Sequence, residues 1–468
     1  MAHRDKGQNA LRSVYELFEN AGANPENALL ATIGVFGMRA VALAEDYLVR
    51  HGVVSVAESG STWKRLLAYQ APDMEHLNDD IDDLSKYADQ DALIAQRIDE
   101  SISSKVVRRA LLQMDAYDMS VKDSESLRSL NRSLDLFIEE LARNKKMMGL
   151  TTLDSFNNLV VRLALARRTK AVESVYDPTC GVGGTLVAAY EVLKKREADK
   201  KVRLYGVDTS SVAVMVTAWR LFLRGFTAYE LRVADVLNPQ EKFGWSHDDY
   251  FDIVCTVPPL YPTRKPRPSI GNPGLQPLPS ENRRADYLFV QHVIDKVKPG
   301  GRAVIAIALT ALNRSGQHET ARKNLICHYG VESVISVPET AVPRIGAAPA
   351  LLVLDLKTPH PHDALYFLAV GEKRGASPRA KPLDDDAVES ILLSYTRFRS
   401  QPSMSALVDV ATVSNHNYSL VPEVYISHEV VTNVSDRVPK TQVDALEREF
   451  ATASESLDKA LERITQWR

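Results

Sequence analysis

The stretch YDPTCGVGGTLVAAYEVL, residues 176–193, decides the fold. A short apolar segment ends at Asp177, a glycine-rich turn follows, and a helical pattern begins at about Thr185. Glycines let the backbone turn tightly and approach a ligand without a Cβ clash, and a helix N-terminus presents free N–H groups. A strand, a glycine turn and a helix in this order are typical of nucleotide-cofactor sites. The spacing matches neither G-x-G-x-x-G nor the P-loop, which argues against dinucleotide and nucleoside-triphosphate binding.

Short apolar segments alternate with helical stretches on both sides of this motif. The predicted strands end at Asp177, Asp208, Asp235, Val257 and Val337, or begin at Arg302 and Ala350. Alternating strands and helices indicate a parallel sheet with helices on both faces. We therefore predict an α/β fold with a seven-stranded, mostly parallel, Rossmann-like sheet. Such sheets bind ligands at the carboxyl ends of their strands, where the motifs described below all lie.

Two further carboxylates end predicted strands. Asp208, in LYGVDTSS, is placed to accept hydrogen bonds from both hydroxyls of a ribose, as acidic residues do in related folds. Asp235, in VADVLNP, is placed to meet the exocyclic amine of an adenine. Either residue has a simpler interpretation as a helix N-cap or a turn residue. Together with Asp177, they predict a nucleoside-containing cofactor at one edge of the sheet.

Composition narrows the class of protein. The chain has 468 residues, 45% of them hydrophobic and 25% charged, and a net charge of -3. This total charge does not by itself indicate nucleic-acid binding, so a DNA footprint would be local or come from a partner. The three cysteines are widely spaced and form no metal-ligand cluster. Their number and the polar N-terminus without an apolar signal region favour a reducing cytoplasm, and no uncharged run reaches the roughly 18 apolar residues of a membrane span.

The pattern divides the chain into four parts. Residues 1–148 are predicted to form a helical N-terminal domain, 149–357 the cofactor-binding core, and 358–440 a mixed α/β extension of that core. In 441–468, apolar residues recur at alternating steps of three and four with charges between them, which predicts a heptad helix. That helix packs either on its own domain or on a partner.

Several motifs together resemble the adenine-N6 DNA methylases. DPTCGVGG is similar to the first motif of that family, FDIVCTVPPLY resembles its strand into Asn-Pro-Pro-Phe, and NHNYSLVPEVYI resembles a signature near its C-terminus. The helical N-terminal part and the terminal helix resemble the methylase subunit of type I restriction-modification systems. The resemblance covers roughly residues 149–468 and implies a methyltransferase-type sheet, with DNA as substrate and a separate specificity subunit as partner, contacted through the terminal helix.

The same resemblance implies S-adenosylmethionine as the cofactor. Its implied contacts are Asp177, Thr179, Gly181, Gly183, Asp208 and Asp235. The implied catalytic segment comprises Val257, Pro258 and Pro259, with Tyr261 as the nearest aromatic.

The catalytic segment departs from the family pattern. Val257 and Leu260 stand where the family has an asparagine or aspartate and an aromatic residue. The exocyclic amine of adenine is a poor nucleophile, and the asparagine oxygen normally accepts a hydrogen bond from it and stabilises developing charge. Valine has no acceptor, and losing one such interaction costs on the order of 10²–10³ in rate. Leu260 cannot stack on a flipped base, whereas Tyr261 has an aromatic ring for that role.

Two other features leave alternatives open. The segment GLTTL, residues 149–153, lacks the proline of the family's Thr-Pro pair, although Thr151 or Thr152 retains a hydroxyl. A basic loop, with Arg264, Lys265 and Arg267 followed by Arg283 and Arg284, either contacts DNA phosphates or is a solvated loop. Three functions remain: an active DNA adenine methylase subunit, a non-catalytic structural or regulatory relative in a DNA-acting complex, and a methyltransferase that acts on RNA or protein.

Overall fold

The structure is a computed structural model that describes most of the chain up to Ile426. The described residues are 6–50, 59–68, 75, 78–79, 102–117, 124–142, 152–167, 171–196, 202–238, 243–245, 250–260, 286–341, 348–356, 362–370 and 383–426. Tyr261, the basic loop and the predicted heptad helix lie outside these residues.

The centre of the fold is a nine-stranded mixed sheet in the order β3-β2-β1-β4-β5-β7-β6-β8-β9. The strands are β1 Ser174–Asp177, β2 Arg203–Asp208, β3 Tyr229–Val233, β4 Phe251–Thr256, β5 Val297–Ala308, β6 Val331–Ser336, β7 Pro349–Asp355, β8 Ala364–Ala369 and β9 Ser405–Asp409. All seven predicted strands are present as β1 to β7. The predicted number of strands was too small, because β8 extends the sheet in parallel beside β6 and β9 pairs antiparallel with β8.

Most of the strand pairs are parallel, as predicted. The exceptions are β7, which runs antiparallel to both β5 and β6, and β9. Every residue of β1, β6 and β7 is buried. Strands that are covered on both faces are rich in apolar residues, and this is clearest in β7, which is apolar up to Asp355, whereas β6 includes Glu332 and Ser333.

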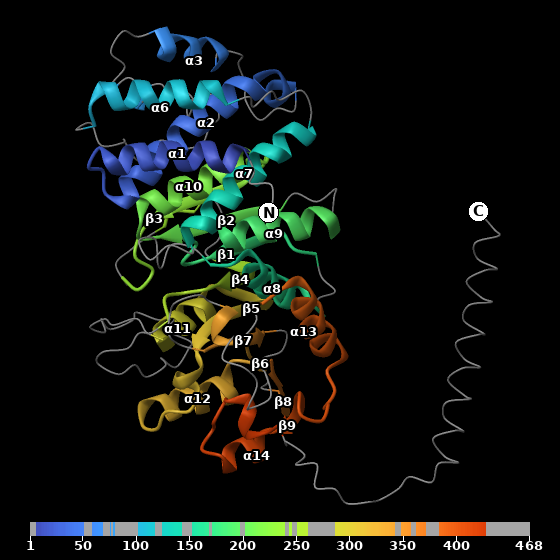
Figure 1. Cartoon of the computed structure of the whole chain (residues 1–468). Helices are drawn as coiled ribbons and strands as arrows, with labels where there is room; N and C mark the ends of the chain where they lie inside the picture. The colour runs from blue at the N-terminus through green and yellow to red at the C-terminus, as the bar shows by residue number, and fades with distance from the viewer. Residues whose placement is uncertain are drawn as a thin grey trace, which may run out of the picture. The chain divides into compact units, whose positions relative to one another are not determined.

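Two hydrophobic clusters cover the two faces of the sheet. Successive side chains of a strand point to opposite faces, and Val175 belongs to one cluster while Tyr176 belongs to the other. The first face is covered by α8 Asp154–Leu165, α9 Gly184–Arg196, α10 Ser211–Phe222 and α13 Asp385–Arg397, and the second by α11 Asp286–Lys296 and α12 Gln317–His328. Figure 1 shows α11 and α12 on the opposite side of the sheet from α8 and α13.

The N-terminal part is helical, as predicted. Its described helices are α1 Lys6–Asn20, α2 Pro25–Arg50, α3 Ser59–Ala68, α6 Ser104–Ala116 and α7 Ser124–Ala142. Helix α2 packs on α10. The contact is so close that a Cβ at Gly37 would lie 2.6 Å from the ring of Trp219. These helices share one hydrophobic cluster with the first face of the sheet, so the described residues to Ile426 form one compact unit.

The apolar character of α2 has a structural explanation. Pro25–Leu43 is long and apolar enough to cross a membrane by length and composition, yet 72% of that stretch is buried inside the structure. Its side chains pack on α1, α3 and α10. This is the pattern of a core helix of a folded domain.

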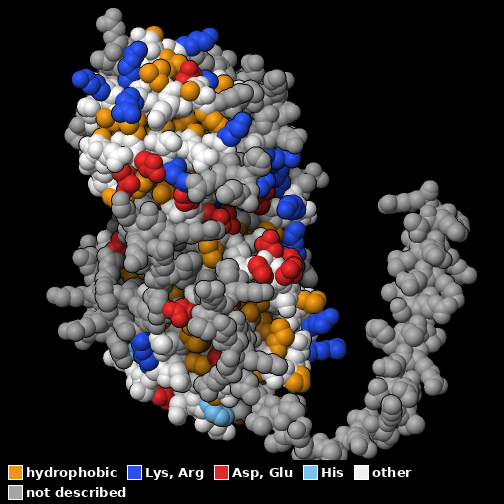
Figure 2. Space-filling view, in the orientation of Figure 1, with side chains coloured by type: hydrophobic (Ala, Val, Ile, Leu, Met, Phe, Trp, Pro, Cys, Tyr) orange, Lys and Arg blue, Asp and Glu red, His pale blue; other side chains and the backbone are white. Residues whose placement is uncertain are grey.

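The C-terminal part of the described chain combines strands and helices. Besides β8, α13 and β9 it contains α14 Val410–Asn415, and 3-10 turns lie at η2 Leu309–Leu312, η3 Glu339–Ala341 and η4 Pro422–Val424. On the face drawn in Figure 2, basic and acidic side chains are interspersed over the described surface. This distribution agrees with the nearly balanced total charge.

Candidate cofactor site

Two of the predicted carboxylates meet at one edge of the sheet. Asp177 is the last residue of β1, and Asp208 is the last residue of the neighbouring strand β2. Asp235 lies two residues beyond the end of β3, in a turn where its Oδ1 accepts a hydrogen bond from the Leu237 amide at 3.1 Å. The carboxyl ends of parallel strands share an edge, and this edge carries all three carboxylates.

Asp177 is almost fully enclosed, with 1% of its surface exposed. Its Oδ1 accepts hydrogen bonds from the Thr179 amide at 2.9 Å and the Thr256 hydroxyl at 2.7 Å. Its Oδ2 accepts a hydrogen bond from the Thr185 hydroxyl. Burial disfavours the charged form and raises the pKa of Asp177 to about 6, even though these three donors lower it.

The backbone conformation of the turn after β1 favours glycine at two positions. Gly181 and Gly183 have φ angles of 51° and 84°, in the left-handed region that favours glycine. A Cβ at Gly183 would also lie 2.7 Å from Cγ2 of Thr217. The Gly181 amide donates to Oδ2 of Asp208 at 2.8 Å. The carboxylate at the end of β2 therefore holds the turn that follows Asp177. Burial raises the pKa of Asp208.

A small cavity joins the glycine turn to the predicted catalytic segment. Its lining includes Asp177, Thr179 and Gly181 together with Val257, and Thr152 from the segment that precedes α8. Thr152 belongs to the predicted GLTTL segment. The fold therefore brings three separate sequence motifs to one cavity.

The cavity is acidic. Four carboxylates and one guanidinium line it: Asp135, Glu139, Asp154, Asp177 and Arg220. Such an environment stabilises a ligand that carries positive charge. The sulfonium and ammonium groups of S-adenosylmethionine are of this type, and the glycine turn leaves its backbone open to a close approach. The residues that line this cavity therefore fit the charged end of that cofactor, whereas the predicted contacts Gly183, Asp208 and Asp235 are not part of its lining.

The predicted catalytic residues differ in exposure. Val257 directly follows β4 and is partly buried, Pro258 is buried, and Pro259 is exposed. Leu260 is buried, with 8% of its surface exposed. Val257 offers the cavity only methyl groups, so its side chain has no acceptor for an amine.

Cysteine chemistry is disfavoured beside the site. Cys180 lies in the glycine turn and Cys255 lies in β4, and both are buried. Burial raises the pKa of each thiol, and the nearby Asp177 raises both further. Because the thiolate is the nucleophilic form, neither cysteine is prepared for attack on a substrate.

The C-terminal signature also lies at this edge of the sheet. The Leu420 amide donates to the carbonyl of Leu312, which lies in η2 directly after β5. The buried Arg322 of α12 donates to the carbonyls of Asn417 and Tyr418, which adopt positive φ angles of 53° and 51°. Residues in such conformations persist where surrounding contacts hold them.

Sequence reasoning missed four residues that shape the site. Thr185 and Thr256 bind Asp177, Asn157 packs against the start of α9, and Arg220 lines the cavity. Thr256 directly precedes the catalytic segment, so its position was a usable signal. The charge of Arg220 was a second usable signal, because this arginine is the only charged residue in the apolar helix α10.

The chain matches a known family over most of its length. A model of the family "N-6 DNA Methylase" matches residues 134–433. The type I restriction enzyme MpnII methylase subunit of Mycoplasma pneumoniae is 22% identical over 342 residues, which are 70% of this chain and 62% of that protein. The MjaIX methylase subunit of Methanocaldococcus jannaschii is 24% identical, over 55% of this chain and 48% of that protein. The chain therefore spans less than two thirds of the length of these relatives.

Solved structures share the fold. A type I restriction-modification methyltransferase subunit from Streptococcus thermophilus has a TM-score of 0.71 at 17% identity and covers 90% of this chain and 99% of its own. A modification subunit of a putative type I restriction enzyme from Vibrio vulnificus has a TM-score of 0.63 at 16% identity, covering 88% of this chain and 94% of its own. At these identities the likeness establishes the fold alone.

Proposed function

Because this chain belongs to the N-6 DNA methylase family, we propose that it is the methylase subunit of a type I-like system. In this proposal it binds S-adenosylmethionine and acts on the N6 amine of adenine in DNA, with a separate specificity subunit that selects the sequence. The family resemblance drawn from the motifs is confirmed by the family match, and the activity, substrate and partner are what we propose.

The observation that carries the proposal is the meeting of Asp177 and Val257 at one acidic cavity. Asp177, Thr179, Gly181, Gly183, Asp208 and Asp235 are the proposed cofactor contacts. S-adenosylmethionine, when bound, supplies the methyl group. Asp208 accepts hydrogen bonds in a position suited to a ribose, and the buried Asp177 contributes negative charge near the cationic end. The segment Val257 to Pro259, with Tyr261 beyond it, faces the target base in this proposal.

One experiment tests cofactor binding and one tests transfer. Calorimetry with S-adenosylmethionine is expected to give a dissociation constant of roughly micromolar strength. No heat at concentrations well above that range would reject the cofactor assignment. Radiolabelled methyl transfer to DNA, with the cognate specificity subunit present, tests the reaction itself. Transfer to RNA or protein instead of DNA would favour the alternative that the chain is a methyltransferase acting on RNA or protein.

A non-catalytic role is the second candidate, and Val257 favours it. Without the asparagine oxygen, an adenine amine in the site has lost one hydrogen-bond acceptor, which costs on the order of 10²–10³ in rate. The chain would then retain the fold and the cofactor and serve as a structural or regulatory subunit of a DNA-acting complex. Cofactor binding without methyl transfer is the result that this candidate predicts.

We also propose a role for each of four parts of the chain. Residues 1–148 form the helical N-terminal domain, 149–357 the methyltransferase core, 358–440 its extension, and 441–468 the helix that contacts the specificity subunit. In the sequence, the basic loop lies between β4 and α11, and we propose that its arginines and lysine contact phosphates of a bound DNA. The proposed location is the cytoplasm, where restriction-modification systems meet DNA.

A further inference from the structure

Helix α10 contains one charged residue in an otherwise apolar sequence, and that residue is buried. The side chain of Arg220 is 2% exposed. A guanidinium is retained in the interior of a protein only where its donors are paired. The partners of Arg220 therefore indicate what the side chain holds in place.

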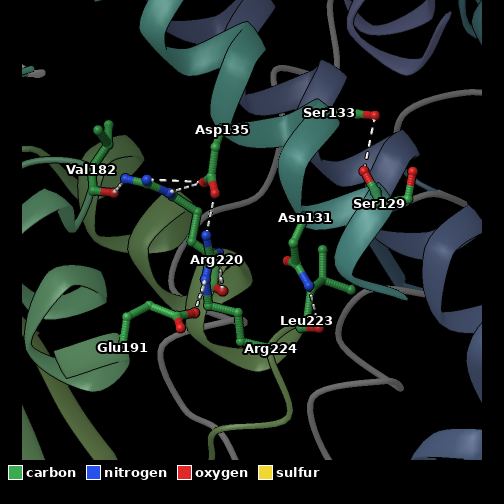
Figure 3. A network of polar contacts seen from close by, with 9 residues as sticks. All are labelled: Ser129, Asn131, Ser133, Asp135, Val182, Glu191, Arg220, Leu223 and Arg224. Carbon is green, nitrogen blue, oxygen red and sulfur yellow. Dashed lines mark hydrogen bonds and ion pairs between the residues drawn. The ribbon is translucent and has the colours of Figure 1, made fainter. Parts of the chain in front are cut away.

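Arg220 connects the glycine turn to the helical N-terminal part. Its Nη1 donates to the carbonyl of Val182 at 2.7 Å, and its Nε and Nη2 donate to Oδ1 of Asp135 on α7 at 3.1 and 3.0 Å. Figure 3 shows the guanidinium between the two partners. One turn earlier on α10, the Thr217 hydroxyl donates to the carbonyl of Gly181 at 2.8 Å. Helix α10 thus holds two successive carbonyls of the turn.

A second arginine attaches α7 without touching the turn. Arg224 pairs with Oδ2 of Asp135 and lies 3.6 Å from Oε1 of Glu191 on α9 (Figure 3). Its Nη1 donates to the carbonyl of Arg220 at 2.9 Å. In addition, Asn131 of α7 donates to the carbonyl of Leu223 at 2.8 Å. Asp135 is therefore shared between a bond that anchors α7 and a bond that orients Arg220.

We propose that Arg220 is a positioning residue of the cofactor turn, and that Asp135 makes the geometry of this turn depend on the seating of α7. The cavity supports this link, because Asp135, Ile138 and Glu139 of α7 line it beside Gly181. Such a link is reciprocal: whatever tightens the turn also favours the docked position of α7. The inference rests on the proposed function only where a cofactor is used as a probe.

Hydrogen exchange in the free protein tests the link without any cofactor. The amides of Cys180 and Gly183 are bonded within the turn, to the carbonyls of Val207 and Cys180, each at 2.8 Å. Asp135→Asn is expected to accelerate exchange of a peptide covering residues 178–187 about tenfold, because it removes a charged acceptor from Arg220. Arg220→Lys is expected to do the same, since a lysine cannot reproduce the planar fork of a guanidinium.

Two further variants test the route of the link. Arg224→Gln removes the other ion pair of Asp135 and loosens α7 but leaves the bond from Arg220 to Val182, so the turn should exchange faster than in the parent and more slowly than in Asp135→Asn. The matched control is Glu389→Gln, which removes the surface pair with Arg162 and should leave exchange of the turn unchanged. Unchanged exchange of the turn in folded Asp135→Asn or Arg220→Lys protein would overturn the inference. Acceleration in Glu389→Gln equal to that in Asp135→Asn would overturn it as well, because a change outside the contacts of Asp135 and Arg220 would then suffice.

Cofactor binding distinguishes a role of Asp135 in positioning the turn from direct attraction between its carboxylate and the cofactor. Asp135→Asn is expected to weaken S-adenosylmethionine and S-adenosylhomocysteine by the same factor, about tenfold, because both depend on the turn. Only the first carries a sulfonium charge. A loss confined to S-adenosylmethionine would mean that the Asp135 carboxylate attracts the cation directly, which contradicts a positioning role. If the parent binds neither compound, the proposed function fails, while the exchange experiment still decides this inference.

Discussion

Thr256 and Asp177 link the two halves of the candidate site through a hydrogen bond of 2.7 Å. Thr256 directly precedes the predicted catalytic segment, and Asp177 ends the strand that leads into the glycine turn. The Thr179 hydroxyl lies 2.6 Å from the Thr256 hydroxyl and completes the connection. The position of Val257 is therefore fixed relative to the proposed cofactor contacts by buried polar bonds between neighbouring strands.

Replacing Asp177 by asparagine is predicted to remove a pH-dependent contribution to stability. The pKa of Asp177 in the folded protein is about 6, above its ordinary value of 3.8, so the folded state holds this proton more tightly than the unfolded state. The contribution is fully present below pH 3.8 and is lost as the pH rises through 6. Relative to the parent, Asp177→Asn should therefore gain about 1–3 kcal/mol between those limits.

Urea unfolding of the parent and of Asp177→Asn across this pH range measures the effect. Asparagine keeps one oxygen for Thr179 and Thr256, and the Thr185 hydroxyl can rotate to accept from the new amide. The variant should therefore fold while its affinity for S-adenosylmethionine falls, since a negative charge is gone. A constant stability difference between parent and variant at every pH would contradict the assigned pKa.

Asp208→Ala is predicted to weaken cofactor binding by about tenfold to a hundredfold. The change removes the proposed ribose acceptor, and bonds to charged groups contribute about 1.5–3 kcal/mol. Calorimetry measures the affinity. The matched control is Asp409→Ala, which removes an aspartate that caps α14 by accepting from the Thr412 amide. That variant should bind like the parent, and an equal loss in both would point to general destabilisation.

Gly184 and Asn157 are predicted to be coupled. A Cβ at Gly184 would lie 2.1 Å from Nδ2 of Asn157 and 2.8 Å from its Cγ. Gly184→Ala should therefore cost about 1–3 kcal/mol of stability through overpacking. Adding Asn157→Ala removes the colliding atoms, so the double variant should be more stable than the sum of the single effects predicts. Strict additivity in urea unfolding would show that α8 shifts to make room.

Removing residues 441–468 is predicted to abolish assembly while leaving the rest folded. The described residues to Ile426 form one compact unit, which gives the shortened chain its own core. Co-purification with the cognate specificity subunit measures assembly, and circular dichroism measures folding. A shortened chain that still co-purifies would reject the proposed role of the terminal helix, and one that unfolds would assign that helix to the chain's own core.

Periodicity predicted the sheet well, and for a physical reason. Strand β7 is buried on both faces, so its residues up to Asp355 are apolar and the run is visible in the sequence. The extension was harder to predict, because only the first residue of β9 is buried, the others are partly or fully exposed, and the strand lies at the sheet edge. Its pattern is short, and only its pairing with β8 identifies it as part of the sheet.

The candidate site was predictable to the extent that strand ends define it. Asp177 and Asp208 end adjacent parallel strands, so their common edge follows from the strand assignment. The bond between Asp135 and Arg220 joins residues 85 positions apart on two helices. Spacing carries no signal for such a contact, because tertiary packing alone brings α7 to α10. The hydroxyl partners of Asp177 are likewise visible only in three dimensions.

Val257→Asn is predicted to raise methyl transfer to DNA. The residue directly follows β4 and lines the cavity with Asp177, so an asparagine there would present an acceptor beside the proposed cofactor site. The following pair, Pro258 and Pro259, fixes the φ angles of the turn. Restoring one such interaction should increase the rate by about 10²-fold if the site is otherwise intact.

The matched change is Val257→Thr, which has nearly the same shape but a hydroxyl in place of a methyl group. Val257→Thr introduces a hydroxyl without the geometry of an amide oxygen, so it should raise the rate of methyl transfer far less than Val257→Asn does. Leu260→Phe is a further step towards the family pattern, although Leu260 is buried and a larger ring would have to displace its neighbours at a cost of about 1–3 kcal/mol. Radiolabelled transfer to DNA, with the specificity subunit present, measures all three. Robust N6-methyladenine formation by the parent would reject the non-catalytic candidate and show that the site tolerates valine, which leaves Tyr261 as the next residue to test for contact with the base.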